Sequence, residues 1–228
     1  MKNKGRDKDA YYFSDYMEIM NTGVIGMVSK FIHRFMDYPY RKKDLEVIEV
    51  GAGNGQHLAL TRLNYKYYLE TDIRDSLQMV RKKHGESASD RRQIDATYLS
   101  GIRDGSFDLL IATCLIAHLD KPELALNSWK RVVKRGGELC LYVPCDPGVF
   151  LRSIRYVSTR RKFIKMGYDH AYQHWTEHRN HFPLINTLIT RIFEGHTVRR
   201  SFFPFVLPSW NLNMFVIYRI RLDFNQKE

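Results

Sequence analysis

The segment VIEVGAGNGQ, residues 47–56, ends an apolar run with glycines at positions 51, 53 and 55. A glycine-rich turn between a strand and a helix lets backbone amides approach a ligand, and the start of the helix adds positive partial charge. The dinucleotide fingerprint G-x-G-x-x-G would require a glycine where the chain has Gln56. Glu49, two residues before Gly51, would repel a phosphate but attract a positively charged group, such as an amino acid head group. The plainer alternative is a tight turn without a ligand.

Carboxylates also stand at the ends of two later strand-like runs. Asp72 lies about twenty residues beyond the glycine loop, where a carboxylate can accept both hydroxyls of a ribose. Glu70 shares its strand face and competes for this role, and Asp72 could instead cap the next helix. Asp95, in QIDATYL, could accept a hydrogen bond from an adenine amino group or serve a turn. We therefore expect three acidic side chains along one cleft.

Short β-like runs alternate with helical patterns along the chain. The apolar spacing over 13–36 predicts an amphipathic helix before the first strand. We expect strands at 45–50, 66–72, 93–95, 107–113, 138–143, 198–206 and 213–222, and helices at 74–84, 121–135 and 184–193. This alternation predicts an α/β fold with a doubly wound, mostly parallel sheet of seven strands, the last of them antiparallel.

The bulk composition narrows the setting and the partners. No apolar leader follows the charged N-terminus, and no run reaches the roughly 20 apolar residues of a membrane span, so we expect a cytoplasmic protein. Three cysteines, an odd number in apolar segments, favour reduced thiols. The net charge of +11 should attract anions, whether nucleic acid, phosphorylated metabolites or an anionic membrane.

The order of these motifs resembles the class I S-adenosylmethionine-dependent methyltransferases over residues 45–145. EVGAGNG resembles their first motif, ETD their second, IDA their third, and GSFDLLIATCLIAHL their fourth strand with its loop. The resemblance implies S-adenosyl-L-methionine as the cofactor. Around the methionine part, it implies contacts from Glu49, Gly51, Gly53 and Asn54, with Ala52 in the same loop. At the ribose it implies a contact from Asp72, with Ile73 beside it in the chain, and at the adenine contacts from Asp95 and Ala96. Next to the cofactor it also places Thr113, Cys114 and Leu115.

With this resemblance, we expect a single methyltransferase domain over residues 1–228. Its parts would be an N-terminal helical cap (1–44), a cofactor-binding core (45–147), an acceptor-side helical insertion after the fifth strand (148–183), and the last helix with the closing antiparallel strands (184–228).

Histidines supply the candidate bases on the acceptor side. His118 follows the fourth strand and could remove a proton from an acceptor hydroxyl, or simply pack there. If 168–181 is helical, one face carries His170, His174, Glu177, His178 and His181. We favour His174 and His178 as catalytic residues, with a solvated polar face as the alternative. The pairs spaced four apart do not complete a defined ligand set, so we expect no metal.

The insertion also mixes basic residues with aromatic and aliphatic ones over 152–165. This mixture suits a phosphate-bearing substrate, peripheral contact with an anionic membrane, or RNA, although charge runs are commonly only solvated surface. The sequence thus predicts methyl transfer to a small or medium-sized acceptor, with O-methylation of an anionic metabolite, glycan precursor or lipid-linked intermediate as the favoured reaction. The alternatives are RNA methylation and a non-catalytic module that binds the cofactor. Nucleic acid is the less favoured partner because no N-P-P-Y or D-P-P-Y motif is present.

Overall fold

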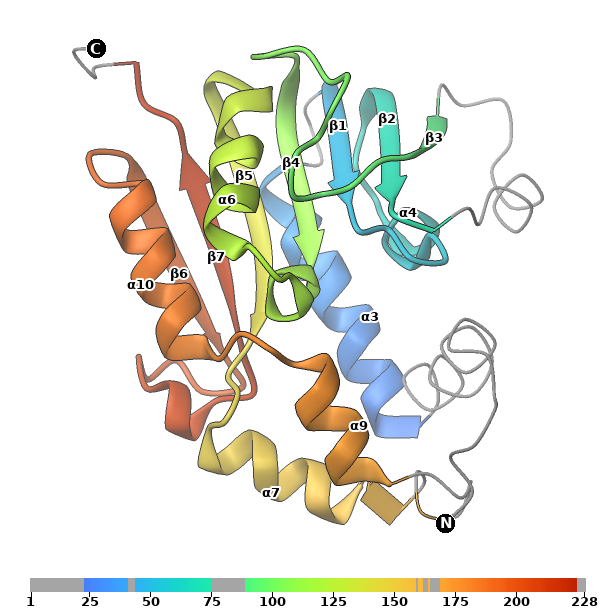
Figure 1. The fold of residues 1–228 in the computed structure, drawn as a ribbon, viewed down its shortest axis with the longest axis vertical. Coiled ribbons are helices and arrows are strands. Elements are labelled where there is room, and N and C mark those ends of the chain that lie inside the picture. Colours follow the sequence, from blue (N-terminus) through green and yellow to red (C-terminus); the bar gives the residue numbers. More distant parts are fainter. Residues whose placement is uncertain are drawn as a thin grey trace.

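A computed structural model describes residues 23–40, 44–74, 89–158, 160–161, 164 and 169–224. Seven strands form one sheet in the order β3-β2-β1-β4-β5-β7-β6 (Figure 1). The strands are β1 (Leu45–Val50), β2 (Tyr65–Asp72), β3 (Ser89–Gln93), β4 (Phe107–Thr113), β5 (Val133–Pro144), β6 (Thr197–Phe203) and β7 (Phe215–Arg221).

Parallel pairing joins β3, β2, β1, β4 and β5, and β7 pairs antiparallel with both β5 and β6. Only β7 therefore runs against the other six strands. This topology confirms the predicted seven-stranded, mostly parallel sheet with an antiparallel last strand. The carboxyl ends of the parallel strands consequently meet at one edge of the sheet.

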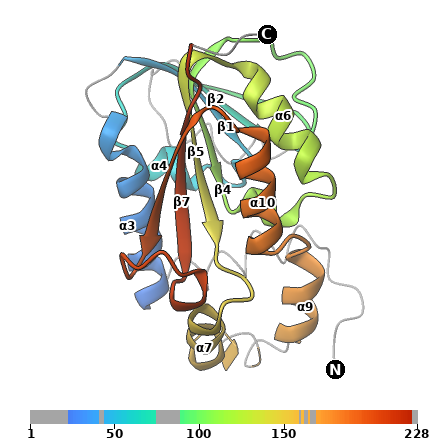
Figure 2. The ribbon, with the colours of Figure 1, turned by 90° about the vertical axis from the view of Figure 1, so that its left-hand side faces the viewer.

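Helices cover both faces of the sheet. The described α-helices are α3 (Gly23–Asp37), α4 (Gln56–Leu60), α6 (Pro122–Val132), α7 (Val149–Val157), α9 (His170–Glu177) and α10 (Phe182–Ile192). Three short 3-10 turns accompany them: η2 (Tyr38–Tyr40), η3 (Leu115–His118) and η4 (Trp210–Leu212). Figure 2 shows α3 on one side of the sheet and α6 with α10 on the other. Helices α7 and α9 lie beyond the carboxyl ends of the strands, below the sheet in Figure 1.

Alternate residues along the strands build two separate cores. Ile48 and Leu110 belong to the cluster that includes Trp129 of α6, whereas Val47 and Leu109 belong to the cluster that includes Ile32 of α3. Because successive strand side chains point to opposite faces, a sheet covered on both sides buries nearly continuous apolar runs. The runs VIEV and FDLLIAT meet this requirement.

Several element boundaries differ from those expected. β3 spans Ser89–Gln93 and not 93–95, so Asp95 lies beyond the strand end. Helix α6 ends at Val132, before the expected 135, because β5 starts at Val133 and pairs with Phe107. Helix α9 ends at Glu177, so the histidines of 168–181 do not share one helix.

Parts of two predicted helices lie outside the described residues. Of the helix expected at 13–36, the structure describes only the portion from Gly23, and nearly all of the helix expected at 74–84 is not described. Within the described part of the chain, no helix combines the length and the apolar character that crossing a bilayer requires. Cys114, Cys140 and Cys145 are free thiols.

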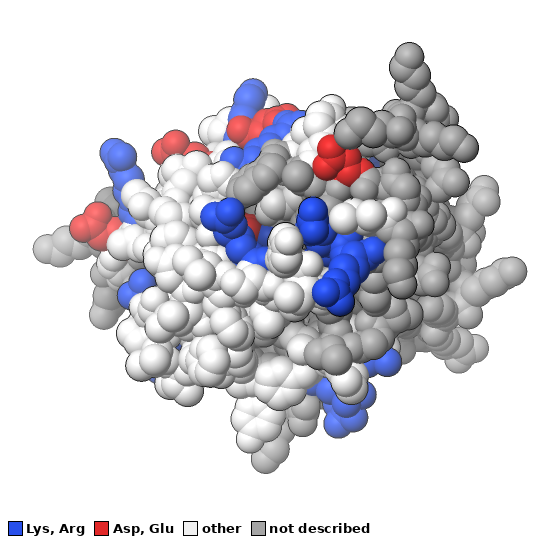
Figure 3. All heavy atoms as spheres, turned by 90° about the horizontal axis from the view of Figure 1, so that it is seen from below, with Lys and Arg blue, Asp and Glu red and all other residues white. Residues whose placement is uncertain are grey.

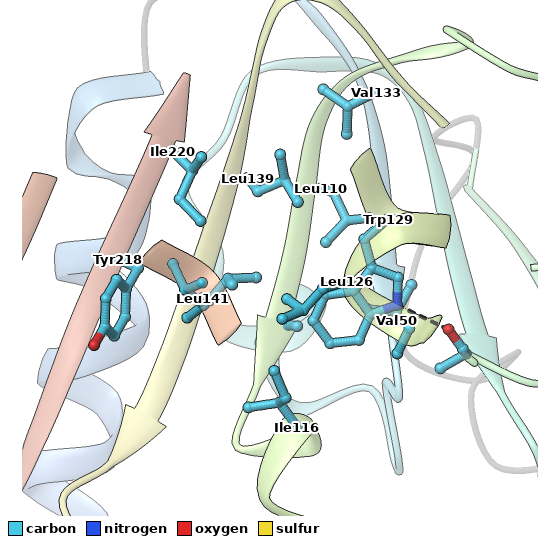
Figure 4. Packing of buried hydrophobic residues seen from close by; sticks show 14 of the residues in the cluster. Val50, Leu110, Ile116, Leu126, Trp129, Val133, Leu139, Leu141, Tyr218 and Ile220 are labelled. Atoms are coloured by element: carbon cyan, nitrogen blue, oxygen red, sulfur yellow. Dashed lines mark hydrogen bonds between the residues drawn. The ribbon is translucent and has the colours of Figure 1, made fainter. Parts of the chain in front are cut away.

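Trp129 links the core to the loop after β3. Its indole is fully buried, and its Nε1–H donates to the carbonyl oxygen of Ala96 at 2.8 Å, the dashed line in Figure 4. We expect Trp129→Phe to lower the free energy of unfolding by about 1–3 kcal/mol, because it removes this hydrogen bond and leaves a cavity. Urea unfolding measures the change. Trp210→Phe is the matched control, since Trp210 is only partly buried; an equal loss in both variants would contradict this role of Trp129.

Candidate functional site

The loop after β1 adopts a backbone that favours glycine. Gly51, Gly53 and Gly55 have φ values of 68°, 56° and 73°, in the left-handed region that side chains other than glycine rarely adopt. A Cβ at Gly51 would also lie 2.6 Å from a methyl carbon of Leu115. The glycines therefore satisfy both a tight turn and close packing against the residues that follow β4.

Asp72 ties the end of β2 to the glycine loop. Its side chain is 4% exposed, and one carboxylate oxygen accepts a hydrogen bond from the Gly53 amide at 2.8 Å. The other oxygen accepts from the backbone amide and the Nε of Arg74, at 3.0 and 3.3 Å. A carboxylate has about four acceptor directions, and three are used here, so Asp72 can support the loop and still accept from one ribose hydroxyl.

Glu49 lies beneath the glycine loop and not at its surface. The side chain is buried, and its carboxylate accepts a hydrogen bond from the Tyr68 hydroxyl at 2.7 Å. Burial raises the pKa of Glu49, although His57 and the Tyr68 hydrogen bond act in the opposite direction. Direct contact of Glu49 with a positively charged ligand group stays a prediction.

Two buried histidines join helix α3 to the helix after the glycine loop. The Nδ1 atoms of His33 and His57 lie 2.7 Å apart, so one must donate and the other accept. The Nε2 of His57 forms an ion pair with Asp37 at 3.2 Å. Burial lowers the pKa of His33 to about 3. Burial also acts to lower the pKa of His57, but the hydrogen bond with Asp37 and the charge of Glu49 raise it overall. We infer that His57 carries the proton and donates it toward His33.

The adenine-side residues lie in the turn beyond β3. The Asp95 carboxylate accepts a hydrogen bond from the Thr97 amide at 2.7 Å. Asp95 therefore acts as a turn residue, the alternative to an adenine contact. The side-chain amide of Gln93 donates to the Ile73 carbonyl at 2.9 Å and so holds the ends of β2 and β3 together. Ile73 is 64% exposed and offers an apolar surface at this edge. Contact of Asp95 or Ala96 with an adenine stays a prediction.

The residues after β4 face the glycine loop from the other side. Thr113 ends the strand, Cys114 has a φ of 58°, and Leu115 starts η3 against Gly51. Burial raises the pKa of the Cys114 thiol to about 12, so this side chain stays protonated and is not a nucleophile at neutral pH. Of the three residues, Leu115 packs against the glycine loop, and contact of any of them with the cofactor stays a prediction.

The predicted catalytic histidines gather around a carboxylate that sequence analysis missed. Asp146 follows β5, and its side chain is 1% exposed. The Nδ1 of His178 lies 2.8 Å from this carboxylate, and the Nε2 of His174 lies 3.4 Å from it. Arg155 of α7 donates from Nη1 to both Asp146 oxygens at 2.5 Å. His118 completes the group, with its ring 4.8 Å from that of His178.

The hydrogen bonds of this cluster fix the tautomers of two histidines. The Nδ1 of His118 must be protonated, because its partner at 2.8 Å is the Glu177 carbonyl. Burial would raise the pKa of Asp146, but hydrogen bonds from His174 and His178 and the Arg155 charge hold it well below its usual range. The carboxylate is therefore ionised, and His178 donates to it from Nδ1. In both rings the acceptor nitrogen is then Nε2.

Burial also keeps these imidazoles neutral. It lowers the pKa of His178 to about 4, against the opposing effect of the Asp146 hydrogen bond. It lowers the pKa of His118 too, although the Glu177 carbonyl partly offsets the change. A neutral imidazole keeps a nitrogen that can accept a proton, as a general base must, but a pKa of about 4 makes His178 a weaker base than an ordinary histidine.

Asp146, His174 and His178 place their donor atoms within 4.8 Å of one another, close enough to consider a metal ion. The Arg155 guanidinium, however, bonds both Asp146 oxygens and lies 3.1 Å from His174 Nε2. This positive charge lies against two of the three candidate ligands, Asp146 and His174, and would repel a cation. The cluster is therefore better described as an ion-paired network, and the absence of a metal stays a prediction.

Two groups of residues were not identified from the sequence. Asp146 could have been found, because a carboxylate directly after a parallel strand lies at the ligand edge of the sheet. His33, Asp37 and His57 gave no comparable signal, since their contact depends on how α3 packs. Of the five residues expected on one histidine face, His181 instead lies at the N-cap position of α10.

Comparisons with known proteins agree with this geometry. Residues 48–141 match the family model described as a methyltransferase domain. Among curated proteins, none matches the chain well enough to indicate a relative. Many solved structures share the fold.

Three of these structures illustrate the likeness. A Methanococcus maripaludis protein named for S-adenosyl-L-methionine-dependent methyl transfer has a TM-score of 0.64 at 12% identity, covering 100% of this chain and 99% of its own. A Haloferax volcanii protein, solved in complex with the Trm112 methyltransferase activator, has a TM-score of 0.61 at 13% identity, covering 96% and 100%. An Archaeoglobus fulgidus S-adenosylmethionine-dependent methyltransferase has a TM-score of 0.61 at 15% identity, covering 92% and 99%.

The motifs, the methyltransferase-domain match over residues 48–141 and the fold are all consistent with a class I S-adenosylmethionine-dependent methyltransferase, which implies S-adenosylmethionine as the cofactor. The residues present fit this cofactor. Gly51 leaves no room for a Cβ next to Leu115, Asp72 keeps about one acceptor direction, and Ile73 exposes an apolar side chain. Which of the twelve predicted positions touch the cofactor stays a prediction.

We expect Asp72→Asn to weaken S-adenosylmethionine binding roughly 10- to 100-fold, because an amide replaces an ionised acceptor of ribose hydroxyls. Isothermal titration calorimetry on the folded variant measures this change. Asp108→Asn is the matched control, since Asp108 lies near the start of β4 and pairs with Lys134. Unchanged affinity of Asp72→Asn would remove Asp72 from the ribose site.

The buried His57 predicts a pH-dependent stability. Its pKa is raised on folding from 6.5, so the stabilisation is complete below about pH 6.5 and is lost as pH rises through the folded pKa. The difference in unfolding free energy between wild type and His57→Asn should therefore shrink above pH 6.5. Urea titrations at several pH values test this. A difference that grows with pH would contradict a protonated His57.

Proposed function

We propose that this methyltransferase transfers the methyl group to a hydroxyl oxygen of a small or medium-sized, anionic acceptor. Metabolites, glycan precursors and lipid-linked intermediates are the acceptor classes that fit. The observation that carries this proposal is the Asp146–His178 pair, with its 2.8 Å contact, next to the end of β5. Similar structures at 12–15% identity indicate the fold and not the acceptor.

A hydroxyl acceptor needs a base, which the Asp146–His178 pair can supply. Bound S-adenosylmethionine provides a methyl group that is already electrophilic, so the protein must mainly position the acceptor and remove its proton. His178 accepts that proton at Nε2. Asp146 holds the productive tautomer and stabilises the imidazolium that forms. Arg155 keeps Asp146 ionised and so acts as a positioning residue.

His118 and His174 have secondary parts in this proposal. His118 packs edge-on against His178 and is held by the Glu177 carbonyl, which limits the ring positions open to His178. His174 Nε2 already faces Arg155 and Asp146. His178 is therefore the favoured base, and the other two support its position.

Positive charge around the cluster favours an anionic acceptor. Arg155 lies within the network, and Arg152, Arg160 and Arg161 are exposed on the same insertion. RNA methylation remains the second candidate because it would use the same charge. A cofactor-binding module without catalysis is the third, but it gives no reason for a buried carboxylate to orient an imidazole.

We expect His178→Asn to lower kcat by at least about 100-fold while S-adenosylmethionine affinity is unchanged, because a general base of this kind contributes a factor of that order. Transfer of radiolabelled methyl groups to fractionated cell extract, followed by assay on the labelled acceptor, gives the rates. Asp146→Asn should also slow turnover and alter the pH profile, since His178 loses its orienting partner. His196→Asn, at the turn before β6, is the control.

The same assay separates the three candidates. Label in base-stable ethers of anionic small molecules, glycans or lipids supports the proposal. Label in RNA would favour the second candidate, and cofactor binding without label in any fraction would favour the third. Undiminished turnover by His178→Asn would exclude the proposed base.

A further inference from the structure

The loop between β6 and β7 exposes three consecutive apolar side chains. Phe205, Val206 and Leu207 are 46%, 94% and 59% exposed. Single exposed apolar residues are common, but a contiguous exposed group indicates contact with a partner or a membrane. The Phe205 ring lies 5.3 Å from that of Phe150, so this loop is next to α7.

Helix α7 continues the same surface with a mixture of apolar and basic side chains. Val149, Tyr156 and Val157 are 65%, 62% and 58% exposed. Arg152 is exposed between them, and the guanidinium of Arg160 lies 4.7 Å from the Tyr156 ring centre. Aliphatic, aromatic and arginine side chains on one surface suit the boundary between headgroups and acyl chains.

Acidic residues are missing from both segments in the sequence. Neither 147–168 nor 195–222 contains an Asp or a Glu. Figure 3, which views the molecule from below, shows Lys and Arg side chains gathered near the middle of this end, beside a broad uncharged surface. The surface is therefore complementary to negative charge.

We propose that this surface docks on an anionic phospholipid bilayer. The docking face consists of Val149, Arg152, Tyr156 and Val157 of α7, Arg160 just after this helix, and Phe205, Val206 and Leu207 of the loop. The loop tip enters the interface, and the arginines contact lipid phosphates. A bilayer is favoured over RNA because Val206 and Leu207 cannot stack on bases, whereas both gain by leaving water.

Docking would place the histidine cluster close to the headgroup layer. Arg155, which contacts Asp146, lies on the same short helix as Arg152 and Tyr156. An acceptor held in the membrane could then reach the cluster without leaving the lipid surface. The docking itself depends on the exposed face alone and not on the identity of the acceptor.

Flotation of the full chain with vesicles tests the proposal. Wild type should float with vesicles of phosphatidylcholine and phosphatidylglycerol and not with phosphatidylcholine alone. Arg152→Gln and Arg160→Gln should each weaken binding by roughly fivefold, since a basic residue near an anionic membrane contributes about 1 kcal/mol. The double variant Val206→Ser, Leu207→Ser should lose the binding that persists at high salt, because it removes the apolar contribution.

Matched controls lie elsewhere on the surface. Arg103→Gln removes an exposed arginine before β4, and Leu124→Ser removes an exposed leucine from α6, well above α7 in Figure 1. Both should float like wild type, and calorimetry with S-adenosylmethionine confirms that each variant is folded. No flotation of wild type would overturn the proposal, as would unchanged binding by Val206→Ser, Leu207→Ser. Complete displacement by soluble glycerol phosphate or by RNA would also overturn it, in favour of an anion site or a nucleic-acid site.

Discussion

The parallel pairing of β1 with β2 and β4 is the constraint on which the rest of the structure depends. It brings the carboxyl ends of strands from distant parts of the sequence to one edge, so the glycine loop, Asp72 and Leu115 become neighbours. A one-residue slip in any of these strands would move each side chain into the opposite core, where its size and shape do not match its neighbours. The two cores therefore protect the register, and the register aligns the cofactor residues.

Buried charge is handled differently on the two sides of this edge. Beneath the glycine loop, Glu49, Asp37 and His57 are enclosed, and their charges are compensated within the protein. Near β5, Asp146 is equally buried, but its partners come from the insertion and leave the Nε2 of His178 as the acceptor. Removing one partner of such a network leaves an uncompensated buried charge, which is costly. The first network thus supports the loop, whereas the second can do chemistry.

Much of the fold could be predicted because each strand carries its own local pattern. The limits of β1 and β4 follow directly from apolar runs bounded by polar or glycine residues. β3 was misplaced because SDRRQ is polar and is a strand only through pairing with β2. The contact between Asp146 and His178 spans 32 positions and depends on how the insertion folds back. No spacing rule in the sequence encodes that contact.

Helix α7 shows how a short element can serve two requirements. Leu151 is buried against the rest of the protein, and Arg155 extends to Asp146, so this side of the helix is held by packing and by charge. Residues on the remaining faces are then free to vary without disturbing the cluster. These residues combine exposed apolar groups with arginine and include no carboxylate. Neither folding nor the contact with Asp146 requires this combination. A selective pressure from outside the molecule, such as a charged surface, explains this composition better than stability does.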